Sequence, residues 1–116
     1  EAMALKHAGV GQVKVFAVEG EGGHTAGAHH EVKNSAYGLG LDNLIYLFDW
    51  NDHGIDSFAN SSVSHGTPAE WFESYGWRVA GTEKGGTEKD GADWGEMTKA
   101  LLGVVHDVVG GGSQHE

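Results

Sequence analysis

Residues 13–23, Val-Lys-Val-Phe-Ala-Val-Glu-Gly-Glu-Gly-Gly, decide how this chain folds. The first six are apolar at every position except one and rich in valine, which is typical of a buried strand. The last four contain three glycines, and such a run after a strand predicts a loop. We therefore expect a strand over residues 13–18 and a loop over residues 19–23 at its carboxyl end.

A second strand is predicted for residues 43–49, Asn-Leu-Ile-Tyr-Leu-Phe-Asp, because its nearly continuous apolar run is typical of parallel strands buried on both faces. A shorter strand is expected at residues 77–80. Helical patterns cover residues 1–8, 25–37 and 67–75 and a final stretch after Asp90. This alternation predicts an α/β fold with a parallel sheet and helices on both faces. Ligands of such sheets bind beyond the carboxyl ends of the strands, so the loops 19–23 and 50–56 are the candidate site.

The length and composition of the chain limit the classes of function that it can have. The length of 116 residues suits one domain, and the helix at the start lacks an N-cap residue, which suggests a fragment or one subunit of a split protein. The net charge of −10 makes nucleic-acid binding improbable. No apolar run is long enough to span a membrane. The absence of cysteine is typical of a reducing compartment, and we expect a cytoplasmic protein.

The two loops together supply the groups of a metal-bridged phosphate site. Glycines let backbone N–H groups approach an anion closely, but Glu21 would repel that anion unless a cation lay between them. Asn51, thirty residues later, offers an amide oxygen, and oxygen ligands suit Mg²⁺. A plain turn is the alternative explanation. The loop is neither a Walker loop nor a dinucleotide fingerprint, so spacing alone names no cofactor.

Several longer stretches resemble the cofactor-binding core of transketolases. The resemblance is carried by Gly20-Glu21-Gly22, Gly27-Ala28-His29-His30-Glu31, Leu41-Asp42-Asn43-Leu44-Ile45, Asp49-Trp50-Asn51-Asp52-His53-Gly54-Ile55-Asp56, Trp71-Phe72-Glu73-Ser74-Tyr75-Gly76-Trp77 and Asp90-Gly91-Ala92-Asp93. It extends over residues 12–105. It implies a thiamine diphosphate-binding fold, present here as a single domain, 1–116, or as a fragment of one.

The resemblance also implies a site. Glu21, Asn51 and the backbone carbonyl of His53 would bind Mg²⁺, with Ca²⁺ or Mn²⁺ as substitutes, and the metal would hold thiamine diphosphate. Gly20, Gly22 and Gly23 would approach the diphosphate, while Ile55 would pack near the thiazolium ring.

Two further residues are candidates for catalysis. Glu31 matches a glutamate at the subunit interface that takes part in proton relay in the family. His24 follows the phosphate loop and is predicted to reach a phosphate or the substrate, with a capping or surface role as the alternative. His29 and His30 would point about 100° apart on a helix, so the histidines do not predict an independent zinc site.

The implied activity is transfer of two-carbon ketol units between sugar phosphates. It would need a pyrimidine-binding half, supplied by a partner subunit of a homo- or hetero-oligomer or by another part of the protein. Two positions depart from the family, since Glu21 replaces an aspartate and Ala26 replaces a second glutamate. These departures leave a non-catalytic scaffold with a degenerate cofactor site as the alternative function. Another thiamine diphosphate enzyme, such as a synthase or dehydrogenase component, is a third possibility.

Overall fold

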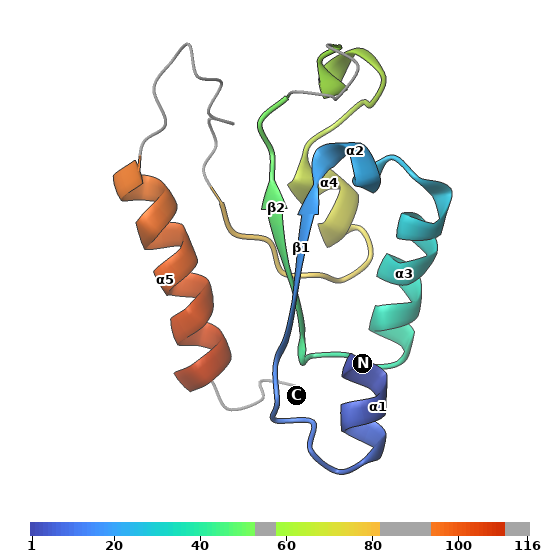
Figure 1. The fold of residues 1–116 in the computed structure, drawn as a ribbon, viewed down its shortest axis with the longest axis vertical. Coiled ribbons are helices and arrows are strands. Elements are labelled where there is room, and N and C mark those ends of the chain that lie inside the picture. Colours follow the sequence, from blue (N-terminus) through green and yellow to red (C-terminus); the bar gives the residue numbers. More distant parts are fainter. Residues whose placement is uncertain (53–57, 82–93, 111–116) are drawn as a thin grey trace. The chain divides into compact units, whose positions relative to one another are not determined.

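The structure, a computed structural model, describes residues 1–52, 58–81 and 94–110 (Figure 1). The chain forms two compact units, Glu1–Arg78 and Val79–Glu116. The first contains a two-stranded sheet and most of the helices, and the second contains one long helix. Each unit is described by itself.

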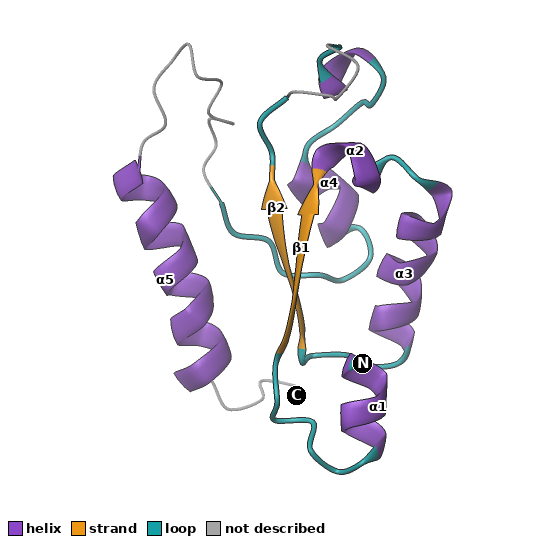
Figure 2. Ribbon diagram, in the orientation of Figure 1, coloured by secondary structure: helices purple, strands orange, loops and turns teal. Residues whose placement is uncertain are grey.

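The first unit is built on a parallel strand pair (Figure 2). Strand β1 (Val15–Gly20) pairs with β2 (Leu44–Asp49), in a register that runs from Val15 opposite Leu44 to Gly20 opposite Asp49. The predicted α/β class with a parallel sheet is confirmed. The helical elements are α1 (Ala2–His7), α2 (Glu21–His24), α3 (Gly27–Gly38), the 3-10 turn η1 (Asn60–Ser62) and α4 (Pro68–Glu73).

The loop predicted for residues 19–23 is wrong, because Glu19 and Gly20 end β1 and residues 21–23 belong to a helical turn. Gly20 is extended, with φ −88° and ψ 160°, and the chain then turns directly into the helical turn α2. The Thr25 hydroxyl donates a hydrogen bond of 2.8 Å to the Gly22 carbonyl, which closes the turn. A glycine-rich sequence permitted this conformation as readily as an open loop.

The short strand predicted for residues 77–80 is also absent, since none of these four residues is extended in a ladder. Its first residue, Trp77, makes other contacts instead. The Trp77 amide donates to the Phe72 carbonyl at 3.2 Å, and its indole Nε1 donates to the Lys33 carbonyl at 3.0 Å. Trp77 therefore closes the turn after α4 and ties it to α3.

Strand β1 is covered on one face only, contrary to the fully buried strand expected. Its residues alternate between half-buried and exposed, and Phe16 and Val18 are 50% and 78% exposed. Neighbouring side chains of a strand point to opposite faces. In β2, by contrast, only Asp49 is exposed and Ile45 is buried.

Helix α4 confirms the predicted capping box. The Thr67 hydroxyl accepts a hydrogen bond from the Glu70 amide at 3.3 Å, and the Glu70 carboxylate accepts one from the Thr67 amide at 2.8 Å. Pro68 occupies the start of the helix, where its missing N–H costs nothing. This cap fixes the position of Phe72, which is buried in the core.

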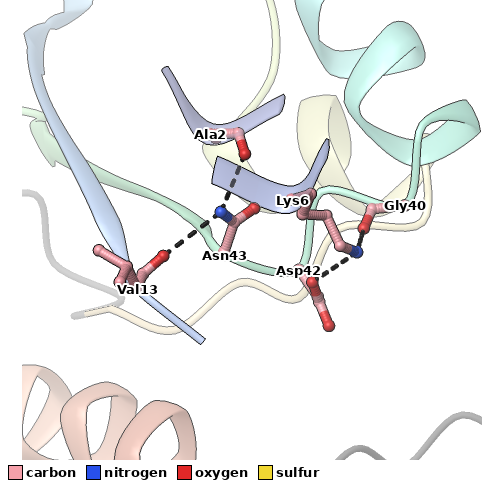
Figure 3. Close-up of polar contacts among 6 residues, drawn as sticks. All are labelled: Ala2, Lys6, Val13, Gly40, Asp42 and Asn43. Atoms are coloured by element: carbon pink, nitrogen blue, oxygen red, sulfur yellow. Dashed lines mark hydrogen bonds and ion pairs between the residues drawn. The ribbon is translucent and has the colours of Figure 1, made fainter. Parts of the chain in front are cut away.

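At the amino ends of the strands, Asn43 connects three segments (Figure 3). Its amide nitrogen donates to the carbonyls of Ala2, at 3.1 Å, and Val13, at 3.3 Å, and its side chain is fully buried. Nearby, the Lys6 amine contacts the Gly40 carbonyl and forms an ion pair of 2.8 Å with Asp42. Helix α1 is thus attached to the beginning of both strands.

The second unit contains α5 (Trp94–Gly110). The predicted final helix is confirmed, although Asp90, its expected cap, lies outside the described residues. Leu101, Leu102 and Val105 are exposed on it. Across the described parts of the chain, none of the helices has the length and apolar character needed to cross a membrane.

We expect Asn43→Ala to lower the free energy of unfolding by about 2 kcal/mol, because it removes one buried and one partly buried hydrogen bond to backbone carbonyls. Urea unfolding followed by circular dichroism measures this change. Asn34→Ala, at an exposed position of α3, is the matched control and should change stability by less than about 0.5 kcal/mol. An equal effect of the two substitutions would contradict the role given to Asn43.

Candidate functional site

The parallel register places the two predicted metal-binding side chains at one edge of the sheet. Gly20 lies opposite Asp49, the last residue of β2. Glu21 follows Gly20 directly, and Asn51 follows Asp49 by two residues. Both residues therefore leave the carboxyl ends of neighbouring strands, where ligands of parallel sheets bind.

Glu21 is the most unusual residue at this edge. Its side chain is only 2% exposed, and neither carboxylate oxygen has a hydrogen-bond partner within the described part of the chain. A buried carboxylate without partners is strongly unfavourable unless a cation or a proton neutralises it. The residue thus fits a metal ligand, although the described residues contain no group of three histidine, aspartate or glutamate side chains arranged to hold an ion.

Asn51 lies two residues beyond the end of β2, and contacts on both sides of it restrain its position. Its amide nitrogen donates a hydrogen bond of 2.9 Å to the Asp49 carboxylate. Asp52 has a left-handed backbone, with φ 58°. Its carboxylate accepts hydrogen bonds from the Ser61 amide, at 2.8 Å, and the Ser61 hydroxyl, at 2.9 Å.

Asp52 and Ser61 were not singled out from the sequence. Their pairing spans nine residues, and an Asp-Ser pair at that distance carries no periodic signal. The sequence offers only the residue type as a signal, because aspartate tolerates the positive φ of Asp52 better than most residues do.

The three glycines of the predicted phosphate loop differ in their surroundings. A side chain added at Gly20 or Gly22 would meet no atom within 4 Å, so both backbones are open to an approaching ligand. A side chain at Gly23 would collide with the carboxylate of Glu19. Gly20 and Gly22 thus fit the predicted contact with a phosphate, whereas a side chain at Gly23 would fit only if the Glu19 side chain moved aside.

His24 lies in the core rather than on the surface. It is fully buried, and its ring stacks on Phe72 with centroids 5.3 Å apart and an angle of 8°. It also contacts the ring of Trp71 at 4.4 Å and the ring of His29 at 4.8 Å. Neither ring nitrogen of His24 finds a hydrogen-bond partner among the described residues. The capping or surface role is therefore wrong.

Burial lowers the pKa of His24 from 6.5 to about 4, and the positive charge of Lys33 acts in the same direction. The pKa of His29 is lowered by the same causes. Both imidazoles are neutral near pH 7, and neutral imidazole has a nitrogen that accepts a proton or binds a metal.

Lys33 is, like His24, a basic residue whose burial was not predicted from the sequence. It is fully buried, and its amine lies 4.9 Å from the ring centroids of Trp71 and Phe72 and 5.5 Å from that of Tyr75. Burial lowers its pKa. His29, Lys33 and Ala36 are the buried residues of α3, and their spacing of four and three residues is the helical signal that could have found this face.

Glu31 has different surroundings from His24. It is exposed and lines an apolar groove of about 370 Å³ between α1 and α3, together with Met3, Ala28, Val32, Ser35, Ala36, Leu39, Leu41 and Leu44. The remaining predicted ligands, His53 and Ile55, lie outside the described residues. The roles of all these residues in catalysis and binding remain predictions.

Comparison with known proteins identifies the family. The profile of the family described as transketolase, thiamine diphosphate binding domain, matches residues 5–103. The chain belongs to this transketolase family of thiamine diphosphate-binding domains. Transketolases of two bacteria are similar to it over 74% of the chain: that of Staphylococcus aureus is 33% identical and that of Geobacillus stearothermophilus 35%.

A transketolase of Physarum polycephalum is 38% identical over 62% of the chain. The chain spans only 11–12% of the length of these curated transketolases. No solved structure matches it. The family description confirms the recognition of a transketolase-type thiamine diphosphate-binding domain.

The neutral His24 makes the stability of this transketolase-family domain depend on pH. In the unfolded chain the histidine takes up a proton near pH 6.5, whereas in the folded chain it does so only near pH 4. Because the unfolded state binds more protons between these values, the free energy of unfolding should decrease as the pH falls from 6.5 to 4, by at most about 3 kcal/mol.

Urea unfolding at pH 7.5, 6 and 5 measures this dependence. His24→Phe keeps an aromatic ring against Phe72 but cannot be protonated, so the decrease should be clearly smaller in this variant; His29 retains its own contribution. Identical pH dependence of the two proteins would show that His24 is not the group responsible.

Proposed function

We propose that this chain is the diphosphate- and metal-binding part of a transketolase-like enzyme that transfers two-carbon ketol units between sugar phosphates. The observation that carries the proposal is Glu21, a buried carboxylate with no partner among the described residues, at the carboxyl edge of the sheet. The membership of the transketolase family names the cofactor as thiamine diphosphate. We infer that the domain has the thiamine diphosphate-binding fold.

In this proposal Glu21 and Asn51, with the carbonyl of His53, hold Mg²⁺, and Ca²⁺ or Mn²⁺ can replace it. The metal neutralises Glu21 and bridges it to the diphosphate, which the net charge of −10 would otherwise repel. Gly20 and Gly22 leave room for the phosphate oxygens, since nothing lies within 4 Å of the positions that side chains would occupy there.

When bound, thiamine diphosphate supplies the carbanion chemistry, and the protein supplies binding and orientation. Asp52 and Ser61 hold the loop that presents Asn51, and the capped helix α4 supports the aromatic core beneath His24. We place Ile55 beside the thiazolium ring. We assign Glu31 and His24 to proton transfer, since the full burial of His24 keeps it from direct contact with a substrate.

The proposed active site also needs a pyrimidine-binding half, from a partner subunit or from another part of the protein. Glu31 lines the apolar groove, and Val32 and Leu39 beside it are 40% and 54% exposed. An apolar surface next to a predicted interface residue supports association through this face of α3. We therefore propose a homo- or hetero-oligomer. We propose a cytoplasmic location separately, on the ground that the sequence contains no cysteine.

A non-catalytic scaffold is the second candidate function. It is favoured by Glu21, one methylene longer than aspartate, and by Ala26, which has no acid to offer a proton relay. Mg²⁺ tolerates little variation around its bond length of roughly 2.0–2.1 Å. The two functions differ in whether the assembled protein binds thiamine diphosphate in a metal-dependent way.

We expect Glu21→Gln and Asn51→Ala each to weaken thiamine diphosphate binding at least tenfold in the presence of Mg²⁺, because each removes a proposed metal ligand. Isothermal titration calorimetry of the complete assembly measures the affinity with and without Mg²⁺. Asp42→Asn, which alters an exposed carboxylate at the other end of β2, is the control and should bind as the unmodified protein does. Unchanged affinity in both test variants would refute the site, and absence of binding in the unmodified assembly would favour the scaffold.

The purified 116-residue chain is expected to show no ketol transfer, because it lacks the pyrimidine-binding half. A coupled assay with sugar phosphate donors and acceptors tests this expectation. Activity should appear only when the complementary half is added. Turnover by the chain alone would contradict the requirement for a partner.

A further inference from the structure

Four basic side chains gather beside the short helix α4. His24 lies on α2, and His29, His30 and Lys33 lie on α3. Between ring centroids, His24 is 4.8 Å from His29 and 6.4 Å from His30. His24 and Lys33 are fully buried, and the exposed fraction of His29 is 9%. These four residues are called the basic cluster below.

Two neighbouring residues of α4 contact every member of the basic cluster. The ring centroids of Trp71 and Phe72 lie 4.4 and 5.3 Å from that of His24, and both lie 4.9 Å from the Lys33 amine. Each of the other two histidines meets one of these rings, at 5.1 and 6.1 Å between centroids. In the described part of the chain, the hydrogen bond that Trp77 donates to the Lys33 carbonyl is the polar contact joining the end of α4 to α3. Helix α4 is therefore attached mainly by rings that cover basic groups.

No aspartate or glutamate forms an ion pair with the basic cluster within the described ranges. The negative charge of Glu19 raises the pKa of His29, but burial and the charge of Lys33 lower it more. The charged or titratable side chains on the surrounding elements are Glu19 on β1, Glu21 on α2, Glu31 on α3, Tyr46 and Asp49 on β2, and Glu70, Glu73 and Tyr75 on α4 and directly after it. Glu31, Asp49, Glu70 and Glu73 are exposed to solvent.

Protonation of a histidine in the cluster adds a like charge close to Lys33 in a region from which water is excluded. Like charges repel more strongly there than in water, and a buried charge also loses its hydration. Both costs disappear once α4 has moved away and water reaches the cluster. We propose that the basic cluster is an acid-sensitive latch, in which protonation of His24 and His29 releases α4 from α3 while the strand pair stays folded. The proposal concerns the fold alone and does not depend on binding of thiamine diphosphate.

The architecture favours a local opening of α4 over unfolding of the whole unit. Helix α4 has six residues, and its capping box lies within its own segment. Short elements with few hydrogen bonds to the rest of a protein open at a lower free energy than its central strands. His24 also contacts the ring of Trp50, 5.8 Å away, which directly precedes Asn51. Release of the latch therefore changes the surroundings of the candidate site.

The direction of the pH dependence follows from the protons that the two states bind. In the closed state the pKa of His24 is lowered to about 4, whereas in the open state it returns to its usual 6.5. The open state binds more protons between these values, so a falling pH favours opening. For His24 alone, the ratio of open to closed molecules increases roughly twentyfold from pH 7 to pH 5.

Native-state hydrogen exchange of the 116-residue protein, followed by NMR at pH 7 and pH 5 in low concentrations of urea, tests the latch. After correction for the intrinsic exchange rates, we expect the amides of residues 71–77 to exchange through an opening that depends little on urea and is at least tenfold more populated at pH 5. The amides of β2 should exchange only through urea-dependent global unfolding. Equal urea dependence and equal opening free energy for α4 and β2 would overturn the proposal, as would an opening of α4 that is the same at both pH values.

Two substitutions identify the group responsible. His24→Phe keeps a ring against Phe72 but cannot be protonated, so the increase in opening from pH 7 to pH 5 should be at least fivefold smaller. His7→Phe removes an exposed histidine of α1 and should leave the increase unchanged. An undiminished increase in His24→Phe would refute the latch.

Should His24→Phe fail to fold, the imidazole ¹⁵N signals of the unmodified protein decide. We expect His24 to remain neutral at pH 5 in molecules whose α4 amides are protected from exchange. Titration of His24 near pH 6.5 with no loss of that protection would show that α4 tolerates the charge, and the proposal would be wrong.

Discussion

The parallel pairing of β1 with β2 is the constraint on which the first unit depends. Its register places Gly20 opposite Asp49, so the chain must leave both strands at the same edge. At the other edge, Asn43 donates hydrogen bonds to the carbonyls of Ala2 and Val13 and keeps α1 against the beginning of the strands. A shift of the register by one residue would turn every side chain of a strand to its other face and would move the loops carrying Glu21 and Asn51 apart.

The core beside this sheet is unusual in its chemistry, because it buries more polar and charged residues than apolar ones. Glu21, His24 and Lys33 are among its largest fully buried side chains, and only four apolar residues among those described are buried. The Lys33 amine lies over the rings of Trp71, Phe72 and Tyr75 and makes cation–π interactions with them. Unfavourable burial of polar groups on this scale is characteristic of functional sites, where binding rather than stability is selected.

Much of the fold was predictable because its signals are local. The apolar runs predicted both strands, and the capping box of Thr67 and Glu70 predicted the start of α4, since each pattern lies within a few residues. The helical turn α2 was missed because its two central glycines permit many conformations and give no helical signal. The burial of Lys33 and His24 was missed because the rings that surround them come from residues far away in the sequence. Of the site, Glu21 and Asn51 were predicted at one edge of the sheet, whereas the Asp52–Ser61 pair was not.

The left-handed conformation of Asp52 has a consequence for binding energy. Two hydrogen bonds from Ser61 to its carboxylate hold this residue in a region of backbone space that few side chains adopt. Because these contacts lie within the protein itself, they restrain the neighbouring Asn51 as part of folding. The conformational entropy of this part of the loop is lost during folding rather than during association, so more of the interaction free energy remains available as affinity.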